Sequence, residues 1–190
     1  MTRRALLALA FVALALPAQR SDWTRPFEAH RIVGDLYYVG TYDLACFLVT
    51  TPEGHILINT GLEGSAPLIR RSMESLGFRY ADLKILLTMQ AHHDHVAALA
   101  AVARETGAAV WATDADADLI ESGGKGDYLD GIPGFEPVTV ARRMADGETI
   151  RLGGVDLKLV LMAGHTRGSA GYTLRTGGMN VVIANMGSIN

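Results

Sequence analysis

The stretch from Leu86 to His95 constrains the fold more than any other part of the chain, because an apolar run there ends in a cluster of metal-ligand side chains. Residues 84–88 have the pattern of a short buried strand. An apolar stripe at helical spacing follows, formed by Val96, Leu99, Ala100 and Ala103. Open α/β sheets bind ligands at the carboxyl ends of their strands, where loops project side chains into a crevice. The stretch therefore predicts an α/β fold with a functional site in this strand-to-helix loop.

The side chains of this loop are of the types that bind transition metals. If residues 90–94 are extended, alternation places Gln90, His92 and Asp94 on one side, and the turn into the helix brings His95 to join them. These four donors lie within six residues and cannot all coordinate one tetrahedral metal ion without strain. The spacing therefore suits two metal ions better than one. Imidazole nitrogen with carboxylate oxygen suits zinc best, ahead of iron, cobalt or manganese. The alternative is that Asp94 caps a helix whose start the histidines merely coat. Three histidines packed beside a carboxylate favour the metal site.

The composition excludes several classes of partner. The chain has 190 residues, of which 49% are hydrophobic and 19% charged, a balance that suits one globular domain with a substantial core. The net charge of -3 provides no basic field for nucleic acid or an anionic membrane, so neither is expected as a partner. Cys46 is the single cysteine and lies in an apolar run, which predicts a small core residue rather than a nucleophile.

The N-terminus has the organisation of a secretory signal. Arginines precede an apolar segment over residues 5–16, and small residues around Ala18 form a cleavage zone. The apolar segment is too short to span a membrane. We therefore expect a signal peptide over residues 1–18, and a domain over residues 19–190 that is exported to the periplasm or secreted.

Strands are predicted on both sides of the metal loop. The expected strands cover residues 27–33, 36–39, 45–50, 55–59, 108–112, 148–152, 155–162, 172–174 and 180–184, and further helices are expected around 69–76 and over 114–121. Asp114 begins a stretch that imitates a calcium loop, but Leu119 replaces the turn glycine and Lys125 the bidentate glutamate, so calcium is not expected. Residues 122–134 form a glycine-rich surface loop that could edge the site.

One distant histidine is a candidate for completing the metal site. His165 lies in Gly164-His165-Thr166-Arg167-Gly168, directly after an expected strand. Such a histidine is by itself more often a turn residue, but beside an incomplete metal site it is the best candidate for the next ligand. His30 and His55 lie on strands of the opening meander and are expected to be structural.

Taken together, these motifs resemble the metallo-β-lactamase superfamily, with its His-x-His-x-Asp-His motif and a later Gly-His-Thr-x-Gly motif. The resemblance covers residues 23–190, and segments 38–41, 58–61, 163–166 and 184–188 are most similar to subclass B3. Gln90 stands where the superfamily usually has histidine, which is similar to the B3 branch that carries glutamine there. The resemblance implies a four-layer αββα sandwich. It also implies a chain whose C-terminal part is missing, because this fold needs further strands and a final helix.

The resemblance also implies a ligand set and a reaction. It places Gln90, His92 and His165 on a first Zn²⁺, and Asp94 with His95 on a second, whose further histidine has no counterpart after His165. A zinc-bound hydroxide, oriented by Asp94 as the catalytic residue, would hydrolyse the amide of a β-lactam substrate. The residues expected to contact substrate are Ser188, Asn190 and Trp23. His93 is not a ligand in the family pattern. We expect it to support the site or to be exposed, and the alternative is that it substitutes as a ligand of the incomplete second site. We expect a monomer.

Other functions use nearly the same ligands. A thioester hydrolase of the glyoxalase II type or a lactonase belongs to the same superfamily. From a different class, the chain could be a catalytically inactive zinc-binding remnant. The number of tightly bound zinc ions distinguishes an enzyme from a remnant, and the preferred substrate distinguishes the hydrolases.

Overall fold

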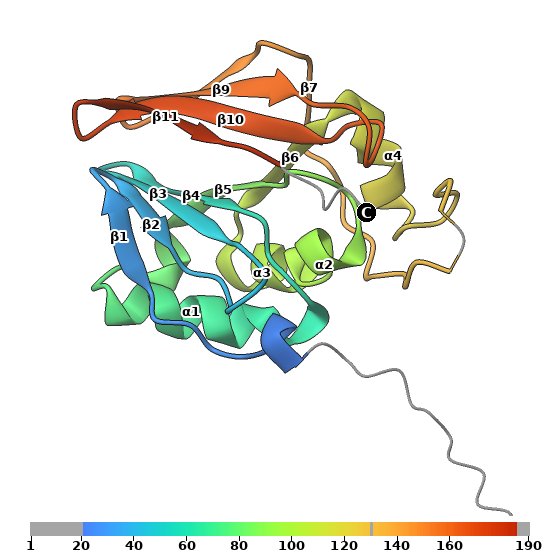
Figure 1. Ribbon diagram of the computed structural model, residues 1–190, viewed down its shortest axis with the longest axis horizontal. Helices are drawn as coiled ribbons and strands as arrows, with labels where there is room; N and C mark the ends of the chain where they lie inside the picture. The colour runs from blue at the N-terminus through green and yellow to red at the C-terminus, as the bar shows by residue number, and fades with distance from the viewer. Residues whose placement is uncertain (1–20, 130, 186–190) are drawn as a thin grey trace, which may run out of the picture.

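Two β-sheets stack face to face, with helices on the outer side of the first (Figure 1). The computed structural model describes residues 21–129 and 131–185, so the expected signal peptide, Ser188 and Asn190 lie outside the described residues. Within these ranges, the first sheet has the strand order β1-β2-β3-β4-β5-β6-β7 and the second the order β11-β10-β9-β8. No helix in the described ranges is long and apolar enough to cross a membrane.

The first sheet changes from antiparallel to parallel pairing at its centre. Its strands are β1 (His30–Val33), β2 (Leu36–Tyr38), β3 (Phe47–Thr51), β4 (Gly54–Ile58), β5 (Leu83–Leu87), β6 (Ala109–Thr113) and β7 (Arg142–Met144). Strands β1 to β4 pair in antiparallel fashion, whereas β4 to β7 run parallel. Parallel strands place their carboxyl ends at one edge of the sheet, and the loop after β5 is the one that carries the histidine cluster.

The two faces of the first sheet bury different apolar clusters. On β4, Leu57 packs toward the helices, while Ile56 and Ile58 pack toward the second sheet. All residues of β4 are buried, which is why the sequence there is a nearly continuous apolar run rather than an alternating one. Cys46 is buried in the helix-side cluster, which confirms the prediction of a core residue, and burial raises the pKa of its thiol to about 12.

Helices α1 (Ala66–Ser75) and α3 (Leu99–Thr106) cover the outer face of the first sheet, and α4 (Asp114–Glu121) packs against β6 and β7. Helix α1 buries Ile69 and Met73 and ends before Gly77, whose φ of 86° is left-handed. The short α2 (His93–Val96) precedes α3. The predicted helix after the metal loop is therefore present as two pieces.

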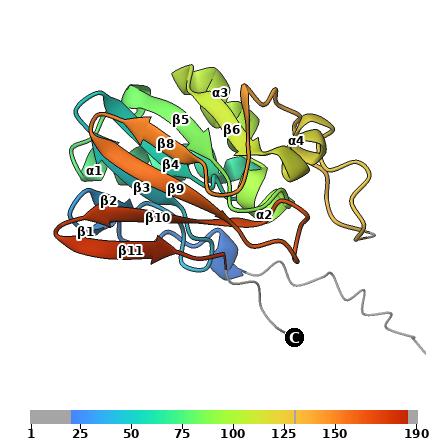
Figure 2. The same ribbon diagram turned by 90° about the horizontal axis from the view of Figure 1, so that it is seen from above.

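The second sheet is an antiparallel unit made from the C-terminal half of the chain. Its strands are β8 (Thr149–Leu152), β9 (Val155–Leu161), β10 (Ala170–Thr176) and β11 (Met179–Ile183). Leu159 and Tyr172 face the first sheet, whereas Lys158 and Val182 are exposed. Seen from above, no helix within the described ranges covers this outer face (Figure 2).

Candidate metal centre

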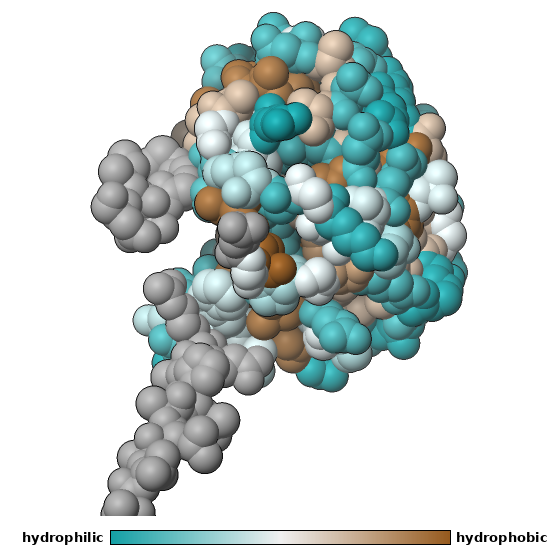
Figure 3. Space-filling model, turned by 90° about the vertical axis from the view of Figure 1, so that its right-hand side faces the viewer, coloured by the Kyte–Doolittle hydropathy of each residue, from teal (hydrophilic) through white to brown (hydrophobic). Residues whose placement is uncertain are grey.

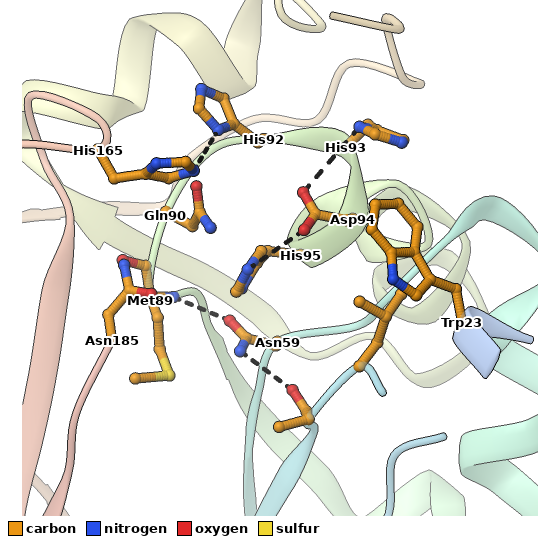
Figure 4. A network of polar contacts seen from close by, with 12 residues as sticks. Trp23, Asn59, Met89, Gln90, His92, His93, Asp94, His95, His165 and Asn185 are labelled. Atoms are coloured by element: carbon orange, nitrogen blue, oxygen red, sulfur yellow. Dashed lines mark hydrogen bonds and ion pairs between the residues drawn. The ribbon is translucent and has the colours of Figure 1, made fainter. Parts of the chain in front are cut away.

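The backbone of Met89 joins the two sheets where the metal loop begins. Its N–H donates to Asn59 Oδ1 over 2.9 Å, and its carbonyl accepts hydrogen bonds from Ala170 N over 2.8 Å and from Asn185 Nδ2 over 3.0 Å. Asn59 follows β4 with a φ of 65°, a left-handed conformation that asparagine tolerates better than most residues. Two asparagine side chains, which follow β4 and β11, and the backbone at the start of β10 therefore converge on the loop after β5 (Figure 4).

Gln90, His92 and His165 form the first group of candidate donors. His92 Nδ1 and His165 Nε2 lie 3.0 Å apart, with ring planes inclined by 76°. Nitrogen ligands of one tetrahedral zinc lie about 3.3 Å apart, given Zn–N bonds of about 2.0–2.1 Å. The oxygen of the Gln90 side chain points toward the two imidazoles in Figure 4, and it is buried with no hydrogen-bond partner among the described residues. A buried acceptor left unpaired costs about 1–3 kcal/mol, so a cation here would satisfy it. These residues fit a metal.

Asp94 and His95 form the second group of candidate donors. Asp94 Oδ2 lies 3.6 Å from His95 Nε2, and both side chains are about one-fifth exposed. The expectation of an extended segment through Asp94 is wrong, because α2 begins at His93, directly after His92. The backbone N–H groups of His95 and Val96 bond to the His92 carbonyl. Asp94 therefore does not continue the alternation of Gln90 and His92. Its side chain comes from the first turn of α2 instead.

Neither group is complete from histidine and carboxylate side chains alone. In the described part of the chain, no three histidine, cysteine, aspartate or glutamate side chains are arranged to hold a metal. Glutamine explains this at the first group, where Gln90 would supply the third donor beside His92 and His165. The second group pairs Asp94 with His95. His93 Nδ1 also lies 4.0 Å from Asp94 Oδ1, but within the described ranges these three side chains are not arranged to hold one metal.

Burial keeps the imidazoles in the form that a metal requires. Burial lowers the pKa of His92, although the nearby Asp127 carboxylate raises it in part. Burial also lowers the pKa of His95 to about 4, although the Asp94 carboxylate opposes this shift. Both rings are therefore neutral near pH 7 and have a lone pair to donate, as metal coordination demands.

A cleft of about 670 Å³ opens beside both donor groups, within the usual size range for small-molecule sites. Its lining includes both donor groups together with Trp23, Phe47, Ile132 and Asn185. The Trp23 indole donates to Asp43 Oδ2 over 3.0 Å, and its ring centroid lies 6.0 Å from that of His93. Figure 3 views the end of the molecule that carries α4, where hydrophilic residues predominate and apolar ones occur in small groups.

Two aspartates that sequence reasoning did not assign to the site support it. Asp116 is 2% exposed and accepts hydrogen bonds from Thr166 Oγ1 over 2.6 Å and from Gly168 N over 2.7 Å. It shares the buried face of α4 with Ala117 and Ile120, so a polar residue at an apolar helical position was the available signal. Asp127 lies in the glycine-rich loop 122–134, against His92, and no sequence pattern distinguishes it there.

Known proteins that share this fold and these motifs identify the family. The family model described as the metallo-beta-lactamase superfamily matches residues 40–184. The chain belongs to this superfamily, and its two sheets with helices are the α/β fold expected from the sequence.

Solved structures of metallo-β-lactamases are similar over most of the chain. The class B3 di-zinc metallo-β-lactamase LRA-12 from an Alaskan soil metagenome is 44% identical, with a TM-score of 0.85 over 88% of this chain and 66% of its own. GOB-18 from Elizabethkingia meningoseptica is 40% identical, with a TM-score of 0.85 over 97% of this chain and 68% of its own. FEZ-1 from Legionella gormanii is 43% identical, with a TM-score of 0.79 over 83% and 62%. The chain thus spans about two thirds of the length of these structures.

Proposed function

We propose that the chain has the activity of a subclass B3 metallo-β-lactamase of the glutamine-containing type, which hydrolyses the amide bond of β-lactams with two zinc ions. The observation that carries the proposal is the convergence of Gln90 Oε1, His92 Nδ1 and His165 Nε2 beside Asp94 and His95. One of the similar structures is described as a di-zinc class B3 β-lactamase, which supports the same metal.

Each donor has a defined task in this proposal. Gln90, His92 and His165 hold the first metal, and Asp94 with His95 holds the second. Zinc would supply Lewis acidity and lower the pKa of a coordinated water to about 7, so that a nucleophile is present at neutral pH. The Asp94 carboxylate points toward Gln90 in Figure 4, and in this proposal it would accept a hydrogen bond from the attacking water and so orient it. The indole of Trp23 forms part of the wall against which a substrate would pack.

Zinc content and substrate choice test this proposal together. We would load the chain with zinc, measure the stoichiometry by competition with a chromophoric chelator, and compare hydrolysis of nitrocefin, a thioester and a lactone. Two tight zinc ions with preference for nitrocefin are expected. Preference for the thioester or the lactone would assign a different activity in the superfamily, and one zinc or none without hydrolysis would indicate an inactive zinc-binding chain. An Asp94→Asn variant should lose hydrolysis, and Asp114→Asn on the exposed side of α4 is its matched control.

We also propose export to the periplasm or the medium and a monomeric state. The arginine-led apolar segment of residues 1–18 supports export. N-terminal sequencing of the protein recovered from the periplasm tests it, with cleavage near Ala18 as the expected result. Unprocessed protein retained in the cytoplasm would contradict it. Light scattering tests the monomeric state.

A further inference from the structure

Two consecutive residues of the glycine-rich loop each contact one histidine of the first donor group. Asp127 Oδ2 lies 3.0 Å from His92 Nε2, and the two side chains are 6% and 4% exposed. Tyr128 donates a hydrogen bond from its hydroxyl to the His165 carbonyl over 2.8 Å. The two histidines are 73 residues apart in sequence, so one short loop segment contacts both of the distant parts of the chain that supply them.

Asp127 lies on the side of the His92 ring that faces away from the donor group. His92 Nδ1 is the atom directed at His165, whereas Nε2 is the atom beside the Asp127 carboxylate. Asp127 is therefore not placed as a donor to the same metal. The contact between the carboxylate and Nε2 is close but is not aligned as a hydrogen bond. Nε2 therefore has no hydrogen-bond partner among the described residues. A close carboxylate beside a buried ring nitrogen still decides which of the two nitrogens carries the proton.

We propose that Asp127 and Tyr128 are positioning residues of the first metal site, Asp127 by fixing the tautomer of His92 and Tyr128 by holding the His165 backbone. With the proton on Nε2, facing the carboxylate, Nδ1 keeps its lone pair for the metal. The opposite tautomer would set a lone pair against a negative charge and would present an N–H where the metal must bind. Carboxylates that accept from the outer nitrogen of a metal-binding histidine commonly act in this way. The inference rests on the proposed metal site but does not depend on the substrate.

Zinc competition titrations on the full chain test the inference without any turnover. Loss of such a carboxylate typically weakens metal binding by about 10–100-fold, and we expect this for one of the two zinc ions in Asp127→Ala. Asp127→Asn keeps an acceptor oxygen and should lose less. Tyr128→Phe removes a single exposed hydrogen bond and should weaken binding of the same zinc by a few-fold. Asp114→Asn, which alters an exposed carboxylate on α4, should bind both ions as the unaltered chain does.

The His92 tautomer is the readout that a merely structural role would not move. Nitrogen-15 spectra of the zinc-loaded chain, assigned with His92→Gln, should show the proton on Nε2. Asp127→Ala should give a mixture of tautomers, and Asp127→Asn should largely restore the original one. An unchanged tautomer in Asp127→Ala overturns the inference. So does equal weakening of both zinc ions together with a lower melting temperature of the metal-free protein, which would indicate general destabilisation.

The outcomes separate this inference from the proposed function. If zinc binds and the Asp127 variants behave as expected while nitrocefin is not hydrolysed, the positioning role stands and the lactamase activity fails. If nitrocefin is hydrolysed and Asp127→Ala binds zinc unchanged, the activity stands and the positioning role fails. A chain that binds no zinc overturns both.

Discussion

Replacing Asp116 with alanine should destabilise the protein and weaken its first metal site at the same time. The carboxylate accepts hydrogen bonds from Thr166 Oγ1 and from Gly168 N, and the backbone of Ala91 lies near enough to help hold its pKa down. Ala91 lies between Gln90 and His92, and Thr166 follows His165. One buried side chain thus bonds α4 to the loop that carries His165 and lies beside the loop that carries Gln90 and His92.

The size of the effect follows from the groups that lose a partner. In Asp116→Ala, the backbone N–H of Gly168 becomes unpaired, at a cost of about 1–3 kcal/mol. The Thr166 hydroxyl keeps Ser169 Oγ, 2.8 Å away. Part of the loss is offset because burial disfavours the charged carboxylate, which is why it raises the pKa of Asp116. A net loss of about 2 kcal/mol in the free energy of unfolding is expected.

Urea unfolding of the metal-free chain measures this loss, and zinc competition measures its effect on the site. Asp116→Asn preserves the shape and at least one acceptor, so a smaller loss of about 1 kcal/mol is expected. Asp118→Ala on the same helix is the control, because its side chain is 87% exposed and surface ion pairs contribute only about 0–1 kcal/mol. The free energies of unfolding of Asp116→Ala and Asp118→Ala are then compared. A difference below about 1 kcal/mol, the size of a surface ion pair, would show that the Asp116 carboxylate does not connect the loops as described.

Three further outcomes are expected. Gln90→His should tighten the first zinc by about tenfold, or about 1.4 kcal/mol, because imidazole is a stronger zinc donor than an amide oxygen; equal affinity in competition titrations would refute this. Burial lowers the pKa of His95 from 6.5 to about 4, so the unfolded chain binds more protons between these values. The metal-free protein should therefore lose stability as pH falls through this window, by at most about 1.4 kcal/mol per unit, and His95→Gln should flatten the loss; equal urea midpoints for the two proteins across the window would argue against it. A Cβ on Gly168 would lie 2.6 Å from Asp116 Cγ, whereas one on Gly64 meets nothing within 4 Å. Gly168→Ala should thus lower stability by about 1–3 kcal/mol while Gly64→Ala leaves it nearly unchanged, and similar melting curves for both would contradict the packing described.

Local patterns predicted most of the elements because apolar residues recur at the period of the element that buries them. The helix over 114–121 is present with the bounds expected from the sequence, and the strand after the metal loop differs from the prediction by one residue at each end. Strand β7 was not predicted, since its Arg-Arg-Met sequence lacks alternation and its place depends on pairing with β6. The histidine cluster was predicted as one extended face, but a helix that begins at His93 divides it.

The supporting carboxylates could not be predicted in the same way, because their partners are remote in sequence. Asp116 bonds to residues 50 and 52 positions away, and Asp127 meets His92 across the cleft end of the sheet. A sequence motif shows ligands because they have fixed residue types at a fixed spacing. It does not show a residue from another element that reaches the ligand only through tertiary packing.

The separation between His92 and His165 has a consequence for the order in which the protein assembles. These histidines are 73 residues apart, and they follow strands of different sheets. The first site can therefore form only when both sheets are docked. The chain loses the conformational entropy of closing this long loop before it gains any stability from the metal. Asp94 and His95 are adjacent in the chain and can capture a metal before any tertiary structure exists. Zinc held in that way also stabilises the unfolded chain and reduces the net gain from binding to the native state. Metal added during refolding should therefore occupy the local pair early, while the long-range site fills only when folding is complete.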